Sequence, residues 1–256
     1  MAKIFCIANQ KGGVGKTTTT VNLAAGLAAI GQRVLMVDLD PQGNATMGSG
    51  VDKRQLQHSV YDILLETATV PQARVRADKC GYDVLGANRE LAGAEVELVD
   101  EERRERRLKA ALRAVDAEYD FMLIDCPPSL SLLTLNGLCC ANGVIVPMQC
   151  EYFALEGLTD LVNTIKQVHA NLNRDLAIIG VLRVMFDPRI SLQQQVSDDL
   201  KAHFGDKVFD TVIPRNVRLA EAPSYGLPGV VFDPSAKGSQ AFVEFAQEMV
   251  KRVQTL

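Results

Sequence analysis

The sequence predicts a doubly wound α/β fold, in which a mostly parallel β-sheet carries helices on both faces. Apolar runs without polar alternation, such as "VLMVD" and "GVIVPM", are typical of strands buried in a parallel sheet. Segments with helical spacing separate most of these runs, so right-handed crossovers would join the strands. The chain has 256 residues, 47% of them apolar, which suits one domain over residues 1–256.

The expected elements alternate along the chain. The first strand, Lys3–Ala8, ends at a glycine-rich loop, and a helix over Lys16–Ile30 follows it. The next strand, "QRVLMVDLD", ends in acidic residues. Further strands are expected at "YDVLGA", "YDFMLIDCPP", "GVIVPM", "AIIGVLRVMF" and "VFDTVIP". Further helices are expected over Leu130–Cys140, Leu155–Leu172, Leu192–Phe204 and Gln240–Val253.

The composition is that of an ordinary soluble globular protein. A net charge of −4 gives no global signal for nucleic acid, although a local basic patch can still exist. The six cysteines form no C-x-x-C pair, which favours free thiols over a disulfide framework or a metal site. We expect neither a signal peptide nor a membrane span, because no apolar run approaches about 20 residues. The charged run Asp100–Lys109 could be a nucleic-acid arm, but its mixed signs favour a solvated helix face.

The segment "NQKGGVGKTT" predicts a phosphate-binding loop between the first strand and the first helix. Gly12, Gly13 and Gly15 allow a tight turn whose N–H groups point inward, next to the positive end of the helix. Lys16 would reach the β- and γ-phosphates, and the Thr17 hydroxyl would bind Mg²⁺. We therefore expect a P-loop NTPase that uses ATP and Mg²⁺. Its nucleotide-binding segment includes Val14 and Thr18.

Acidic residues end two of the predicted strands, where ligands bind in open α/β sheets. Asp125 follows an apolar run, as a Walker-B acid does, and would bind Mg²⁺ through water. Asp40 precedes Pro41 at the start of a loop, which suits a metal-site residue that orients the attacking water. Each acid could instead cap a turn, and for Asp38 the two interpretations remain equally open.

Four segments together resemble one family. These are "KGGVGKTTTTVNLA", "VDLDPQGNAT", "LIDCPPSL" and "VIPRNVRLAEAPSYG". They are similar to the ParA/Soj-type partition ATPases of the deviant Walker-A (MinD/ParA) superfamily, over most of the chain. The resemblance implies a chromosome or plasmid partition ATPase whose ATP-bound homodimer binds DNA non-specifically. It also implies slow hydrolysis stimulated by a ParB-type partner, and a nucleoid-associated location in the cytoplasm.

The resemblance also assigns residues. Lys11 corresponds to the signature lysine, which reaches the ATP of the partner subunit; the alternative is that it points to solvent. A side chain at Gly12 would obstruct the two subunits. Pro214 and Asn216 are expected near the adenine. The family also places Glu151 at the dimer interface without fixing its role, and Arg189 and Arg218 are expected to contact DNA.

Basic and acidic residues are equal in number, eight each, from Arg174 to Lys237, so composition does not support the DNA contacts. We expect no helix-turn-helix before the first strand. A MinD-like membrane ATPase is the main alternative, and it would need a C-terminal amphipathic membrane helix. The spacing of Phe242, Phe245 and Met249 favours a helix packed on its own core. Dethiobiotin synthetases and nitrogenase iron proteins share the fold class and are further alternatives.

Overall fold

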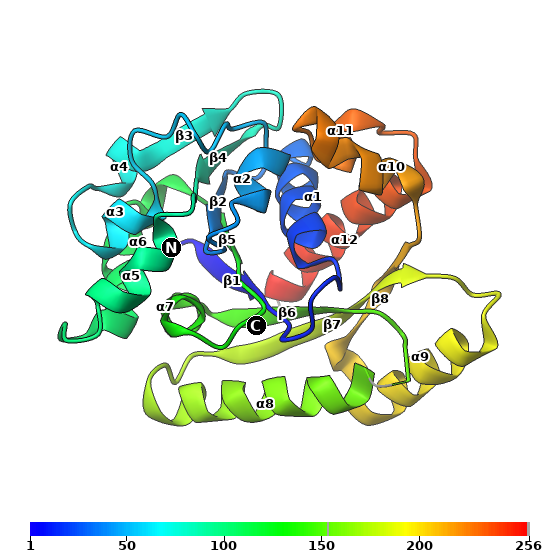
Figure 1. Cartoon of the computed structure of the whole chain (residues 1–256). Coiled ribbons are helices and arrows are strands. Elements are labelled where there is room, and N and C mark those ends of the chain that lie inside the picture. The colour runs from blue at the N-terminus through cyan, green and yellow to red at the C-terminus, as the bar shows by residue number, and fades with distance from the viewer. Residues whose placement is uncertain (153, 255–256) are drawn as a thin grey trace.

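The computed structural model of the protein describes residues 1–152 and 154–254. Within them, eight strands form one sheet in the order β3-β4-β2-β5-β1-β6-β7-β8 (Figure 1). Neighbouring strands are parallel except β3 and β4, so the predicted mostly parallel, doubly wound sheet is confirmed. The strands are β1 (Lys3–Ile7), β2 (Val34–Asp38), β3 (Arg74–Ala77), β4 (Tyr82–Leu85), β5 (Phe121–Asp125), β6 (Gly143–Met148), β7 (Ala177–Phe186) and β8 (Val208–Pro214).

Helices cover both faces of this sheet, as Figure 1 shows for α1 and α12 on one side and α7 and α8 on the other. The longer helices are α1 (Lys16–Ala29), α5 (Leu91–Glu97), α6 (Arg107–Arg113), α7 (Leu132–Cys140), α8 (Ala154–Asn171), α9 (Ser191–Phe204) and α12 (Lys237–Gln254). The short ones are α2 (Asn44–Gly48), α3 (Val60–Leu64), α4 (Val70–Ala73), α10 (Val217–Glu221) and α11 (Gly229–Phe232). Single 3-10 turns lie at Arg104–Arg106, Asp116–Glu118, Gly205–Lys207 and Ala222–Tyr225.

Two apolar cores lie on the two faces of the sheet. One contains the buried side of α1 together with Phe242, Phe245 and Met249 of α12. These three side chains are at most 1% exposed, which confirms that the apolar face of α12 packs on the protein's own core. The other core lies under α3, α5, α6, α7 and α8. All six cysteines are buried and free, as expected.

The register of the strands aligns the carboxyl ends of β1, β2 and β5. Asp125 at the end of β5 is aligned with Ile7 of β1 on one side and with Asp38 of β2 on the other. Because all three strands run parallel, their carboxyl ends meet beside the loop that follows β1. The acids predicted from the sequence and the phosphate loop therefore lie together at the carboxyl ends of the central strands.

The charged run Asp100–Lys109 is only partly helical. The first residues form a turn, with a 3-10 segment at Arg104–Arg106, and α6 begins only at Arg107. Arg103 sits at φ 54°, in the left-handed region, which interrupts any continuous helix through the run. The expected solvated helix face therefore exists only over the last residues of the run.

Candidate functional site

The loop between β1 and α1 has the geometry of an anion-binding loop. Gly13 and Gly15 adopt φ angles of 74° and 78°, in the left-handed region that favours glycine. Gly15 is the N-cap residue of α1, and no described side chain caps this helix N-terminus. The first N–H groups of a helix have no partner within the helix, so they remain available for a phosphate group.

Lys16, the first residue of α1, is held inside this loop. Its side chain is 8% exposed, and Nζ donates a hydrogen bond to the Lys11 carbonyl oxygen at 3.1 Å. Burial lowers the pKa of Lys16, while the negative charges of Asp125 and Asp40 act in the opposite direction. A buried ammonium without a directly paired carboxylate is a ready counter-ion for a phosphate.

Asp125 is joined to α1 by two hydroxyl groups. Thr17 Oγ1 donates to Asp125 Oδ2 at 2.8 Å, and Thr20 Oγ1 donates to Oδ1 at 2.9 Å. Burial, followed by the charge of Asp38, raises the pKa of Asp125 to about 8. Thr20 was missed in the sequence analysis. It lies three residues after Thr17, and this spacing places both hydroxyls on one face of the helix.

This part of the site fits a magnesium ion held together with phosphate oxygens. The Thr17 hydroxyl and the Asp125 carboxylate are hard oxygen donors, and adjacent buried carboxylates favour a cation between them. Among residues 1–152 and 154–254, no group of three or more His, Cys, Asp or Glu side chains could hold a metal alone. Mg²⁺ usually takes few protein ligands, and nucleotide phosphates can supply further oxygen ligands.

The two acids at the end of β2 have different surroundings. Asp38 is fully buried, and its Oδ2 accepts from the Thr46 N–H at 2.8 Å and from Thr46 Oγ1 at 2.7 Å. Burial raises the pKa of Asp38 to about 6, against the Thr46 hydrogen bonds. Of its two open interpretations, the structure therefore favours the turn-capping one. Asp40 is partly exposed, and within the described part of the chain the Gln42 N–H is the one donor to its side chain, at 2.9 Å.

The Lys11 side chain forms an ion pair at the surface of the protein. Its Nζ contacts Glu151 Oε2 at 2.6 Å, and the two side chains are 48% and 49% exposed. The Asn9 side chain fixes the start of the loop, because Oδ1 accepts from the Lys11 N–H and Nδ2 donates to the Pro147 carbonyl oxygen. The Lys11 backbone therefore belongs to the phosphate loop, whereas its side chain is held by an acid of the same subunit rather than free in solvent.

Gly12 faces open space. A methyl group built on it would meet nothing within 4 Å, and its φ is not in the left-handed region. The chain itself therefore does not require glycine at this position. The neighbouring Gly13 is different, because it needs a positive φ and its carbonyl oxygen accepts from Gln149 Nε2 at 3.0 Å.

The predicted base contacts line a small cavity beside α1. Pro214 and Asn216 border this cavity of about 110 Å³ together with Gly15, Thr18 and Met185. The Asn216 side chain also caps α10, because its Oδ1 accepts from the Arg218 N–H at 2.9 Å. Met185 was missed; its φ of 51° places its side chain next to Gly15 and cannot be predicted from sequence pattern.

The two arginines expected at DNA are exposed but paired. Arg189, 87% exposed, contacts Asp187 at 2.6 Å. Arg218 contacts Glu221 at 2.9 Å and Asp233 at 3.3 Å. Exposed ion pairs are weak, so an incoming phosphate can replace these carboxylates. The arrangement permits the expected contacts without providing strong local positive charge.

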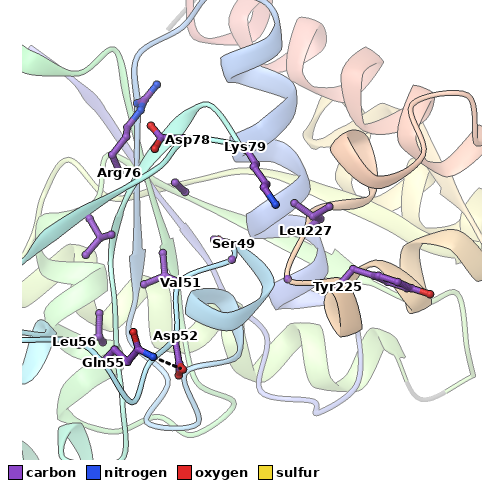
Figure 2. A pocket seen from close by; sticks show the side chains of 14 residues that line it. Ser49, Val51, Asp52, Gln55, Leu56, Arg76, Asp78, Lys79, Tyr225 and Leu227 are labelled. Carbon is purple, nitrogen blue, oxygen red and sulfur yellow. Dashed lines mark hydrogen bonds between the residues drawn. The ribbon is translucent and has the colours of Figure 1, made fainter.

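A larger cavity, of about 510 Å³, lies outside the nucleotide site (Figure 2). It is bordered by the chain after α2, by β3 and the turn after it, and by residues 225–227. Its charged side chains are balanced, with Arg76 and Lys79 against Asp52 and Asp78, and the Asp52 carboxylate is bound by Arg54. These features indicate no particular ligand.

Comparison with known proteins agrees with this site. A family model described as an AAA domain matches residues 2–178. The chain is 53% identical over 249 residues to the sporulation initiation inhibitor protein Soj of Bacillus subtilis, covering 97% of this chain and 98% of that protein. It is 51% identical over 252 residues to the chromosome partitioning protein ParA of Caulobacter vibrioides, covering 98% and 94%. The chain belongs to the ParA/Soj family of chromosome-partitioning ATPases.

Solved structures place this ParA/Soj chain among nucleotide-binding proteins. A cobyrinic acid a,c-diamide synthase from Mycobacterium smegmatis, with bound ADP and magnesium, superposes with a TM-score of 0.87 at 39% identity, covering 99% of this chain and 96% of that one. The cell division ATPase MinD of Pyrococcus furiosus gives 0.79 at 27% identity, covering 98% and 99%. Both identities are lower than those to the partition proteins. The ADP and magnesium of the first structure agree with the cofactors predicted from the sequence.

The family assignment also bears on the membrane alternative. Among the helices in the described part of the chain, none combines the length and apolarity that crossing a bilayer requires. The apolar side of α12, which a MinD-like interfacial helix would have to present to lipid, is occupied by the protein's own core.

Proposed function

We propose that this ParA/Soj chain is an ATP-dependent DNA-partitioning switch formed by residues 1–256 as one ATPase domain. ATP binds the monomer, two subunits close over their nucleotides, and the dimer holds DNA of the nucleoid without sequence preference. Hydrolysis is slow alone, and a ParB-type partner stimulates it to release the DNA. The observation that carries this proposal is the different placement of the two lysines in one phosphate loop. Lys16 is buried in its own site, and Lys11 lies outside it.

The phosphate loop and α1 hold the nucleotide. Gly12–Thr18 surround the phosphates with N–H groups, and Lys16 supplies the cation. Pro214 and Asn216 border the base. Magnesium, when bound, neutralises charge on the β- and γ-phosphates, and Thr17, Asp125 and Asp40 are the residues that would hold it, directly or through water.

Asp40 is assigned to the chemical step. It is partly exposed, and its carboxylate has one hydrogen-bond donor among the residues that the structure describes, the Gln42 N–H. Its remaining acceptor positions can orient a water molecule toward the terminal phosphate. Asp38 is unsuited to this role, because Thr46 and the Asp40 N–H occupy its oxygens.

Lys11 acts on the second subunit. Phosphoryl transfer needs positive charge beside the developing oxyanions, and a cation supplied in trans makes closure depend on the γ-phosphate. In the monomer, Glu151 holds Lys11 at the surface. Dimer closure therefore exchanges a carboxylate partner for a triphosphate, and the bare position at Gly12 leaves room for the two loops to approach.

DNA binding follows from dimerisation. Affinity for the DNA backbone rises steeply with the number of phosphates contacted, so two copies of a modest surface bind much more strongly than one. Arg189 and Arg218 are the proposed contacts, each exchanging a carboxylate for a phosphate.

Binding of random-sequence duplex DNA with ATP, with ADP and without nucleotide tests the proposal. The wild-type protein should bind only with ATP. Lys11→Ala should bind ATP but not DNA. DNA binding that is independent of nucleotide, or that persists in Lys11→Ala, would contradict the switch.

A further inference from the structure

A strongly basic hollow lies away from the phosphate loop, where α6 and the turn before it meet the end of α8. We call it the α6 hollow; its volume is about 500 Å³. Its basic lining residues are Arg103, Arg106, Arg107, Lys109 and Arg113. Glu66 and Glu102 are its acidic ones, so the lining carries a net charge of +3 (5 − 2) in a chain of net charge −4.

The structure pairs two of these five cations with acids, Arg106 with Glu105 at 3.4 Å and Arg107 with two partners. Arg107 is bound by Glu66 on one side and by Glu101 at 2.8 Å on the other. Within the described residues, no ion pair involves Arg103, Lys109 or Arg113. The hollow therefore presents unpaired cations, whereas both arginines assigned to DNA above are held by carboxylates.

The cations are arranged as a stripe. Lys109 and Arg113 lie four residues apart, which places them on one side of α6, and Arg106 belongs to the 3-10 turn directly before this helix. From Lys109 to Arg113 the stripe extends roughly 6 Å along α6 at 1.5 Å per residue. Four of the five cations are arginines, whose planar guanidinium groups bind phosphate oxygens in a fixed geometry. A stripe of this kind fits successive phosphates of a nucleic-acid strand.

The basic turn is also fixed in place. Asn136 of α7 is fully buried; its Nδ2 donates to the Arg104 carbonyl oxygen at 2.9 Å, and its Oδ1 accepts from the Leu108 N–H at 3.2 Å. These bonds tie both ends of the turn to a helix of the core. A surface ordered in advance loses less conformational entropy when it binds.

The hollow is separate from the other DNA surface. Figure 1 shows α6 at the left of the molecule, whereas α9, which follows Arg189, and α10, which carries Arg218, lie at the right. A DNA contact at the α6 hollow would therefore form a second surface, apart from the surface that carries Arg189 and Arg218.

We propose that the α6 hollow is a second contact surface for the phosphate backbone of duplex DNA. This inference rests on the proposed function, because it assumes that the ATP-bound protein meets DNA. On this inference, the unpaired cations of α6 contribute to DNA binding together with Arg189 and Arg218. They would help to set both the affinity for DNA and the dependence of that affinity on salt.

The test is the affinity for a random-sequence duplex, measured by fluorescence anisotropy over a roughly sixfold range of salt concentration around 0.1 M with a non-hydrolysable ATP analogue. The variant is Lys109→Gln with Arg113→Gln. Lys79→Gln with Lys207→Gln is the control, since it removes the same charge at two exposed lysines outside the hollow. The slope of log affinity against log salt should become shallower by about two per contacting subunit. Affinity near 0.1 M salt should fall by at least tenfold, while the control retains the wild-type slope.

The outcomes separate this inference from the proposed function. If the wild-type protein binds DNA with the analogue, and the variant matches the control in affinity and slope, the α6 assignment alone is wrong. If the wild-type protein does not bind DNA at any salt, the proposed function fails as well. Loss of binding to vesicles of anionic phospholipid, with DNA binding unchanged, would make the hollow a lipid-binding surface and overturn the proposal. An unchanged melting temperature establishes that the variant is folded.

Discussion

The two lysines of the phosphate loop lie five residues apart and have opposite surroundings. Lys16 is 8% exposed, and its Nζ donates a hydrogen bond to the backbone oxygen of Lys11 within the loop. Lys11 is half exposed and is bound by Glu151, from a segment 140 residues further along the chain. The same residue type therefore serves two purposes: one lysine completes a site within its subunit, and the other is positioned for a ligand outside it.

Removing the inner lysine should have the largest effect. Lys16→Ala should weaken ATP binding by about a hundredfold or more, because it removes the buried cation from the phosphate site. Titration with a fluorescent ATP analogue measures the loss. Lys11→Ala is the matched control and should bind ATP nearly as well as the wild-type protein. Equal losses of ATP affinity in the two variants would show that Lys11 and Lys16 both bind the nucleotide of their own subunit.

Replacing Asp40, the residue proposed to orient water, should impair ATP hydrolysis and leave dimerisation intact. Asp40→Ala should bind ATP and dimerise, but hydrolyse it roughly a hundredfold to a thousandfold more slowly. Phosphate release in a single turnover gives the rate, and sedimentation with ATP gives the dimer. Turnover close to that of the wild-type protein would show that Asp40 does not orient the attacking water.

A side chain at Gly12 should block closure without affecting the fold. In Gly12→Val the added group meets nothing in its own subunit, so ATP binding and melting temperature should be retained. The opposed loop should exclude it, and the dimer should weaken by at least tenfold, as a clash at a close-packed contact does. Sedimentation with ATP should find monomer. A normal dimer would mean that the loops do not meet at this position.

Releasing the outer lysine should have the smallest effect. Glu151→Gln removes the carboxylate that holds Lys11 in the monomer, and exposed ion pairs contribute little. Dimerisation with ATP should strengthen by no more than about fivefold. The control is Glu151→Asp, which retains the charge. If Glu151→Gln instead weakened the dimer strongly, Glu151 would act across the interface rather than within the monomer.

The sequence predicts most of this fold, because continuous apolar runs and helical spacing are local signals. Strand β3 was missed, since the alternation in "RVRA" belongs to a short antiparallel edge strand with one exposed face and lacks a buried run. The short helices α2 and α10 were missed for a related reason: they are single turns without a periodic apolar face.

The candidate site also has some parts that the local sequence predicts and others that depend on tertiary packing. The Gly-Lys-Thr spacing and the acids that end apolar strands are enough to predict the loop, Thr17 and Asp125. The pairing of Lys11 with Glu151 depends on how distant segments pack, and so do the carboxylate partners of Arg189 and Arg218. The left-handed backbone of Met185 has no local signature either, because a methionine seldom adopts it.

Whether Lys11 acts on its own nucleotide or on that of the other subunit can be tested directly with mixed dimers. Lys11→Ala retains an intact Asp40, and Asp40→Ala retains an intact Lys11, so each protein alone should hydrolyse ATP poorly. If Lys11 acts in trans, a one-to-one mixture should form dimers with one complete site, and ATPase activity should recover to about a quarter of the wild-type rate. If the mixture shows only the sum of the two low activities, Lys11 acts within its own subunit, and the proposed exchange of Glu151 for the partner's triphosphate is wrong.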